Sequence, residues 1–229
     1  MLEYEGQVCR SVKSIIAVSE ADAEKMRALY GVSRVTAVPT GVDVAFFTPP
    51  AEAQPATDLV FVGSMDWMPN VDGVVWFVRE VLPLIKRKLP GCSLAVVGRT
   101  PGREVTELAE RDTRIRITGT VADVRPWLWG SKVAIVPLRI GGGTRLKIYE
   151  AMAARTPVVS TMIGAEGLDI APGEDILIAD QPEAFAEACV RLISDGDERR
   201  RLADAAWRHV ETKHSWQAAA LEFVRALVG

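Results

Sequence analysis

Short apolar runs alternate with amphipathic stretches along most of the chain, from Asp58 onward. Each apolar run is rich in β-branched residues, and a polar or glycine-rich turn separates it from a stretch with helical spacing of apolar positions. The runs predict strands at 59–62, 94–97, 115–117, 133–137, 158–161 and 176–178. The amphipathic stretches predict helices at 71–88, 103–111, 124–130, 145–154, 182–194, 198–212 and 216–227. Because strands and helices alternate, we expect an α/β fold with helices on both faces of a parallel sheet.

Residues 1–44 have the same alternation on a smaller scale, and a proline-rich stretch at 47–55 follows them. This first segment offers only two strands, at 15–18 and 35–38, which are too few for a core of their own. We therefore interpret 1–44 as the remnant of a preceding domain, 45–57 as an interdomain linker and 58–229 as the main domain. The last helix, in 215–229, is expected to pack back on the preceding domain. The alternative is that 1–44 extends the main sheet.

Composition narrows the class of protein. With 229 residues and 48% hydrophobic content, the chain can bury a full core. Its net charge is −3 with the two signs interspersed, so no basic field exists to bind nucleic acid. Cys9, Cys92 and Cys189 lie too far apart for a disulfide framework or a zinc motif. Without a signal peptide or an apolar run of membrane-spanning length, we expect a globular protein of the cytoplasm.

The stretch 137–161 carries the clearest chemical signal. A strand ends there, and the glycines that follow are Gly141, Gly142 and Gly143. Such a loop can approach a ligand closely and present bare backbone amides. Thr144 is expected to cap the next helix. Arg145 and Lys147 fall in the first turn of that helix, where cations are unfavourable unless an anion lies opposite. A phosphate would be such an anion.

A simpler interpretation of this loop is a glycine connection followed by an ion pair between Lys147 and Glu150, three residues apart. This interpretation leaves unexplained why two cations lie at the positive end of a helix beside three glycines, so we favour the phosphate site. Glu150 lies one turn deeper in the helix. Its carboxylate can accept hydrogen bonds from vicinal hydroxyls such as those of a ribose.

The same stretch, PLRIGGGTRLKIYEAMAARTPVVST, resembles the donor-site motif of the group 1 glycosyltransferases, which are retaining enzymes of the GT-B fold. In that fold two Rossmann-like domains face each other across a cleft. SIIAVSEADAEKM and AVPTGVDVAFFTP are similar to the end of the acceptor domain and the interdomain crossover. LVFVGSMDWMPNVDGVVWF resembles the first strand and loop of the donor domain. Further similar segments are LAVVGRTP, ITGTVADVRPWL and EGLDIAPGEDILIAD, so the resemblance covers nearly the whole chain.

The resemblance implies that the chain is the C-terminal, donor-binding half of a hexosyltransferase of polysaccharide biosynthesis. Its donor would be a sugar linked to a nucleoside diphosphate such as UDP or GDP. No metal and no other cofactor are expected. The implied partners are the nucleotide sugar and an N-terminal acceptor domain that this sequence does not contain. Contact with a membrane surface would come through that domain, and a homodimer through exposed apolar surface. The chain alone is expected to be inactive.

The resemblance also implies roles for individual residues. Glu150 would hold the donor ribose, and Thr144 with the amides around it would lie at the diphosphate. Gly63, which ends the first strand of the main domain, would let the phosphates approach its loop. The backbone near Thr120 and Val121 would border the base. The remaining expected donor contacts are Ser64, Asn70, Arg99, Leu146 and the three glycines, Gly141, Gly142 and Gly143.

The chain departs from the family pattern at two places. Many relatives have a second glutamate ahead of the ribose glutamate, with seven residues between the two, and that position is Gly142 here. Relatives often carry an arginine and a lysine in the first loop of the donor domain, where this chain has Ser64, Met65, Asp66 and Asn70. We therefore expect Arg145 and Lys147 to be the catalytic cations that stabilise the departing phosphate. Arg99 and Arg139 are additional candidates for positive charge.

Two other functions fit the same fold. The first is another enzyme class, a nucleotide-sugar epimerase or a phosphorylase; a phosphorylase would need a lysine in a pocket for pyridoxal phosphate, which the sequence does not indicate. The second is a module that binds a nucleotide without catalysis, an interpretation favoured by the glycine at position 142.

Several further signals are interpreted as structural. The acidic triplet DGD at 195–197 is expected to be a turn, with Asp197 as the cap of the next helix, rather than a metal motif. His209 and His214 are five positions apart, so we expect them on different helix faces and neither as a metal ligand. Trp67, like most of the tryptophans, is expected to pack in the core.

Overall fold

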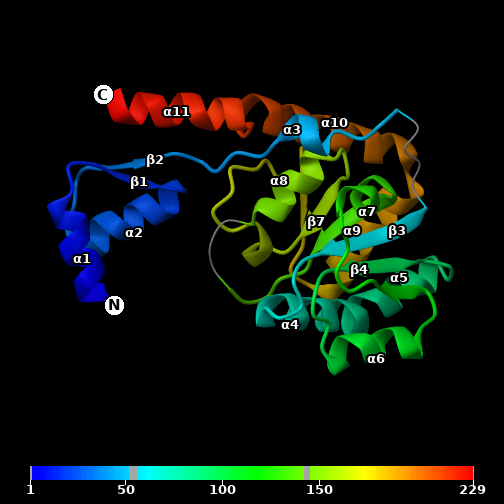
Figure 1. The fold of residues 1–229 in the computed structure, drawn as a ribbon. Coiled ribbons are helices and arrows are strands. Elements are labelled where there is room, and N and C mark those ends of the chain that lie inside the picture. Colours follow the sequence, from blue (N-terminus) through cyan, green and yellow to red (C-terminus); the bar gives the residue numbers. More distant parts are fainter. Residues whose placement is uncertain (1, 52–55, 142–144, 229) are drawn as a thin grey trace.

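The computed structural model describes residues 2–51, 56–141 and 145–228. Its main sheet has six strands in the order β5-β4-β3-β6-β7-β8, and every pair of neighbours is parallel (Figure 1). The strands are β3 (Thr57–Val62), β4 (Leu94–Val97), β5 (Ile115–Ile117), β6 (Ser131–Val136), β7 (Val158–Ser160) and β8 (Leu177–Ile178). The order reverses between β3 and β6, which makes the carboxyl edge of these two strands the place where ligands bind in such sheets.

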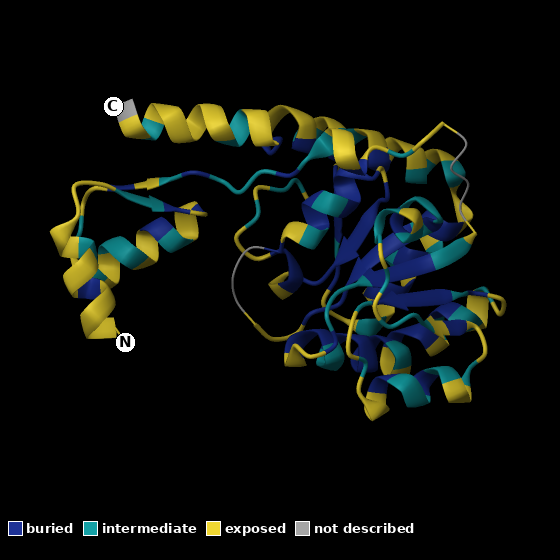
Figure 2. Ribbon diagram, in the orientation of Figure 1, coloured by how far each residue is buried: buried dark blue, intermediate teal, exposed yellow. Residues whose placement is uncertain are grey.

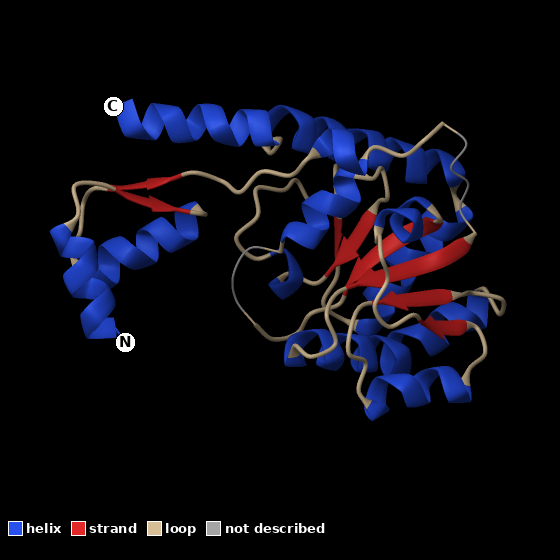
Figure 3. Cartoon of the chain, in the orientation of Figure 1, coloured by secondary structure: helices blue, strands red, loops and turns tan. Residues whose placement is uncertain are grey.

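Helices cover both faces of this sheet (Figure 3). On one face α5 and the π-helical turn η1 pack with α9, while α8 packs with α3 and α10. Their bounds are α4 (Met68–Trp76), η1 (Phe77–Val81), α5 (Leu82–Lys88), α6 (Arg103–Arg111), α7 (Arg125–Trp129), α8 (Leu146–Ala153), the 3-10 turn η2 (Ile163–Ala165), α9 (Pro182–Ser194), α10 (Gly196–Lys213) and α11 (Trp216–Val228). The predicted α/β fold is therefore confirmed.

The core lies between the sheet and these helices, and Figure 2 shows the strands as its most deeply buried part. Every residue of β4 is buried, and Phe61, Val133 and Val158 of the neighbouring strands are fully covered. Strands that are covered on both faces read as continuous apolar runs, which is why the sequence located them well. Their burial holds the loops at the carboxyl edge in fixed positions.

The first segment forms a small unit beside the main domain (Figure 1). It consists of α1 (Leu2–Ser11), β1 (Ile15–Ala17), α2 (Glu20–Tyr30) and β2 (Val35–Ala37). β1 and β2 pair with each other in a separate parallel sheet, over a small cluster formed by Ala17, Ala23 and Val35. Since β1 and β2 form a sheet of their own, the alternative in which this segment extends the main sheet is wrong. The boundaries proposed for the domains stay a prediction.

Residues 38–47 run from this unit onto the main domain and end in the short helix α3 (Val44–Phe47), which the sequence did not predict. Phe47 is buried, and its carbonyl accepts a hydrogen bond of 2.7 Å from the indole of Trp129. The first residues of the predicted linker therefore lie in a helix that packs on the main domain, while residues 52–55 lie outside the described part.

The C-terminal helix α11 leaves the main domain next to residues 38–47, which we call the crossing segment. The Val42 amide donates to the His214 carbonyl at 2.7 Å, and the Trp216 amide donates to the Val42 carbonyl at 3.1 Å. From this point α11 extends in the direction of the first segment (Figure 1). At the other end of α10 the prediction for the cap was wrong: Asp195 caps the helix, accepting from the amides of Asp197 and Glu198.

Within the described residues, no helix combines the length and the apolar character that crossing a membrane requires.

Candidate functional site

Two glycines bring the backbones at the ends of β3 and β4 together. Gly63 directly follows β3, and its amide donates a hydrogen bond of 2.9 Å to the Val97 carbonyl. Gly98 follows β4, and a Cβ atom at this position would lie 1.8 Å from the Gly63 carbonyl oxygen. No side chain can occupy that space, so position 98 requires glycine. The sequence analysis singled out Gly63 but missed Gly98, although both glycines directly follow buried strands.

Asn70 links this edge to the helix that follows β6. It lies in the first turn of α4 and is buried. Its side-chain amide donates to the Ser64 carbonyl at 2.7 Å, and its Oδ1 accepts from Lys147 Nζ at 2.9 Å. A Cβ atom on Gly63 would lie only 2.6 Å from Lys147 Nζ. The structure thus brings together four of the predicted site residues, which come from two different strand-to-helix connections.

Lys147 is a partly buried cation of this site. Burial, and in second place the charge of Arg145, lower the pKa of Lys147 to about 7, while Glu150 acts in the opposite direction. The ammonium also lies 4.5 Å from the centroid of the Phe61 ring. Among the described residues Lys147 forms no ion pair, so the predicted alternative of a Lys147–Glu150 pair is wrong. A buried ammonium beside bare backbone favours an anionic ligand.

Arg145 is the second buried cation and occupies the N-cap of α8. The predicted cap was Thr144, one residue earlier. Burial lowers the pKa of Arg145, and Glu166 opposes the shift. Its guanidinium carbon lies 4.9 Å from the centroid of the Trp67 ring. Trp67 is 38% exposed, so the prediction that it packs in the core was wrong. Its ring instead forms part of the surface beside the site.

Gly141 shows why the loop before α8 needs glycine at its start. It has φ +112°, a backbone conformation that residues with a side chain rarely adopt. A Cβ atom there would also lie 2.7 Å from Nη2 of Arg145. The other predicted loop residues, Gly142, Gly143 and Thr144, lie outside the described residues.

Glu150 lies half-buried in the same helix as Lys147. Burial raises the pKa of its carboxyl, and Lys147 opposes this shift. Glu150 and Leu146 line a cavity of about 390 Å³ whose opposite wall is formed by the crossing segment and α11, including Gly41, Phe46 and Trp216. A carboxylate that faces a cavity from a helix can accept hydrogen bonds from hydroxyls of a bound molecule.

The more exposed cations beside the site are paired with aspartates. Arg99 Nε donates to Ser64 Oγ at 2.8 Å and lies 3.4 Å from Asp66. Arg139 forms a bidentate pair with Asp72, at 2.6 and 3.0 Å. The predicted contribution of Arg99 and Arg139 is therefore offset by neighbouring carboxylates.

Thr120 and Val121 lie in the loop after β5, at the outer edge of the sheet. Thr120 is exposed and Val121 packs against the core. Their place at the carboxyl ends of the strands matches the expected side of the sheet. In the described part of the chain, no hydrogen bond connects them to Ser64, Asn70 or Lys147.

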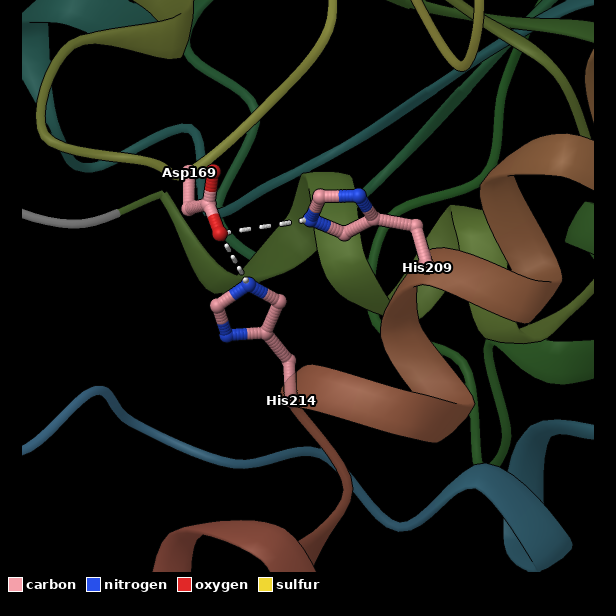
Figure 4. Close-up of side chains that lie close together, drawn as sticks. All are labelled: Asp169, His209 and His214. Carbon is pink, nitrogen blue, oxygen red and sulfur yellow. Dashed lines mark ion pairs between the residues drawn. The ribbon is translucent and has the colours of Figure 1, made fainter. Parts of the chain in front are cut away.

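A second cluster of polar side chains lies around the end of α10. The prediction that His209 and His214 occupy different helix faces was wrong. Helix α10 ends at Lys213, and His214 turns back with φ −126° and ψ 15°. The two imidazole rings stack with centroids 5.2 Å apart, and both approach Asp169 (Figure 4).

The chain resembles known proteins along its whole length. The family model for glycosyl transferases group 1 matches residues 56–195. The lipopolysaccharide core biosynthesis mannosyltransferase LpcC of Rhizobium leguminosarum is 27% identical, over 95% of this chain and 64% of the relative. The D-inositol 3-phosphate glycosyltransferase of Xylanimonas cellulosilytica is 30% identical, over 94% of this chain and 57% of the relative.

Solved structures support the same fold. The Anabaena protein HepE, crystallised in complex with UDP and glucose, superposes with a TM-score of 0.81 at 14% identity, over 99% of this chain and 66% of that one. Such neighbours have the GT-B fold, and this chain corresponds to its C-terminal half. The chain therefore spans roughly half to two thirds of the length of these relatives.

Proposed function

Because this chain belongs to the group 1 glycosyl transferases, we propose that it is the donor-binding half of an enzyme that moves a sugar from a nucleoside diphosphate to an acceptor with retention. The acceptor would bind a second, N-terminal domain. Residues 1–44 would belong to this domain, and the rest of it would correspond to the part of the relatives that this chain does not span. UDP and UDP-glucose occupy HepE, a neighbour of the same fold, which supports this class of donor.

The observation that carries the proposal is the position of Lys147. Its ammonium is partly buried at the carboxyl edge of β3, the strand where the sheet order reverses, and lies against the bare backbone of Gly63. Lys147 also belongs to the first turn of α8, at the positive end of the helix dipole. These features together support the proposal that a phosphate group binds here.

The chemistry of transfer requires a site of this kind. When the bond between the sugar and the diphosphate breaks, negative charge builds on the departing β-phosphate. Lys147 and Arg145 would stabilise this charge, and the burial of Arg145 together with the partial burial of Lys147 would strengthen the interaction. The proposed mechanism uses no metal ion at this subsite. Since Gly142 stands where many relatives have a second glutamate, the backbone amides of the loop would contact the donor sugar in place of that carboxylate.

The remaining residues would hold the nucleoside. The Glu150 carboxylate faces the cavity beside α8 and would accept hydrogen bonds from the two ribose hydroxyls. The base would lie along the backbone near Thr120 and Val121, farther toward the edge of the sheet.

Calorimetry with UDP, GDP and the corresponding monophosphates tests the phosphate site. We expect the preferred nucleoside diphosphate to bind at least about tenfold more tightly than its monophosphate, because the second phosphate lies next to the buried cations. Lys147→Met should abolish this preference. Lys86→Met is the matched control, since Lys86 is a half-buried lysine that pairs with Asp112 on another surface. Equal affinity for the two nucleotides in the unaltered chain, or an unchanged preference in Lys147→Met, would contradict the assignment of the phosphate site.

A further inference from the structure

Three potential metal ligands converge beside the crossing segment, away from the proposed phosphate site. Asp169 Oδ2 lies 3.8 Å from Nε2 of His209 and 3.7 Å from Nε2 of His214 (Figure 4). The three ligand atoms all lie within 4.8 Å of one another. His209 projects from α10, His214 is the residue that follows this helix, and Asp169 lies in the loop that follows η2. A single ion could therefore connect two separate parts of the main domain.

The contacts of His209 leave its Nε2 available to bind an ion. Its Nδ1 lies 3.1 Å from Oδ2 of Asp175, a carboxylate that is itself buried. This contact favours the tautomer in which Nδ1 holds the proton and Nε2 presents its lone pair to Asp169. Nε2 of His209 is buried and has no hydrogen-bond partner among the described residues. A carboxylate behind a histidine, with the far nitrogen directed at a shared point, is the usual arrangement around protein-bound zinc.

We propose that Asp169, His209 and His214 bind a divalent transition metal ion, with Zn²⁺ as the best match to two imidazoles and one carboxylate. With bonds of about 2.0–2.1 Å, the edges of a zinc tetrahedron are about 3.4 Å long. The two distances from Asp169 Oδ2, 3.8 and 3.7 Å, exceed this length by a few tenths of an ångström, and the two histidine nitrogens lie within 4.8 Å of each other, so the side chains must close in around the ion. The fourth position would face a cavity of about 400 Å³ that Asp169 and His214 line together with residues of the first segment.

The present partners of these ligands can accommodate the ion. Nε2 of His214 lies 3.2 Å from the Tyr149 hydroxyl, which also contacts the backbone amide and carbonyl of Asp169 at 3.1 and 3.3 Å. Tyr149 therefore keeps two partners when His214 turns to the metal. Lys213 Nζ lies 3.0 Å from Asp169 Oδ2, but its side chain is 57% exposed and can move into solvent. Lys213 thus competes with the ion for one ligand.

The position of the site suggests a structural role. The His214 carbonyl accepts the Val42 amide at the point where the crossing segment meets the end of α10. An ion held by His214 would fix this junction to the loop of Asp169, and so stabilise the place where the two parts of the chain meet.

Titration of the chain with Zn²⁺, with calorimetry and thermal unfolding as readouts, tests the proposal. We expect one ion per chain with micromolar or tighter affinity and a melting temperature that rises with Zn²⁺ concentration. Co²⁺ in place of Zn²⁺ should give the visible bands of a tetrahedral site without the charge-transfer band of a thiolate, which excludes binding by the cysteines.

The variants separate the metal from other causes. His209→Ala should weaken binding by more than about 100-fold, since loss of outer contacts alone costs 10–100-fold. His214→Phe keeps a ring stacked on Tyr149 and should lose binding to a similar extent. Lys213→Ala should bind Zn²⁺ more tightly than the unaltered chain, because the competing ammonium is gone. Absence of Zn²⁺ binding, a thiolate spectrum, or full binding by both histidine variants would each overturn the proposal.

Discussion

Glu150 holds a carboxylate in a half-buried position on the wall of a cavity, with the Lys147 charge in the same helix opposing the effect of burial on its pKa. Replacing it with alanine should weaken nucleotide binding by about 1.5–3 kcal/mol, the usual value of hydrogen bonds to a charged group. Glu150→Gln should lose less, because the amide oxygen still accepts a hydrogen bond. Calorimetry gives the affinity, and thermal unfolding shows whether the domain stays folded.

Glu211→Ala is the control for this experiment, since Glu211 is an exposed glutamate of α10 outside the cavity. It should leave nucleotide affinity unchanged. If Glu150→Ala lowers the melting temperature strongly while the affinity stays the same, Glu150 has a structural role and the assignment to the ribose is wrong.

At the scale of elements, the site depends on how closely the ends of β3 and β4 approach each other. Gly98→Ala would place a methyl group 1.8 Å from the Gly63 carbonyl, a contact that neither backbone can relieve without moving. We expect a loss in the free energy of unfolding at or above the upper end of the ~1–3 kcal/mol typical of overpacking. Urea unfolding measures it.

Gly91→Ala is a matched control for the contact, because a Cβ atom at Gly91 would meet nothing within 4 Å. This variant should unfold close to the midpoint of the unaltered chain. Equal midpoints for the Gly98 and Gly91 variants would contradict the close approach of the two strand ends.

At the scale of the whole molecule, α11 and the first segment present apolar side chains to solvent. Leu221 is 61% exposed, Leu227 61% and Leu29 64%, and Phe223 and Val224 lie beside the two leucines of α11. Exposed apolar faces of this kind favour self-association. We expect the chain to dimerise or aggregate as its concentration rises, which sedimentation velocity can measure.

The double variant Leu221→Glu, Leu227→Glu should shift this equilibrium toward monomer without lowering the melting temperature, since both side chains already contact water. A chain that stays monomeric at the highest concentrations tested, or a variant that associates as strongly as the unaltered chain, would exclude these surfaces as the cause.

The sequence by itself determined the order and type of nearly all the elements, because strands covered on both faces and helices with one apolar face leave regular patterns in the chain. It also predicted that Gly141, Lys147 and Glu150 belong to one strand-to-helix connection, since they lie within ten residues of one another. Local spacing is enough to relate residues this close together.

Only the tertiary structure decided which distant residues meet. The hydrogen bond between Asn70 and Lys147 spans two connections, and the contact of Gly98 with Gly63 depends on the pairing of two strands. The approach of His209 and His214 depends on the end of α10 at Lys213 and on the hydrogen bonds that join His214 and Trp216 to Val42 of the crossing segment. Periodicity describes the direction of a side chain only within one continuous element. Past the end of that element its direction is set by the contacts of the folded chain.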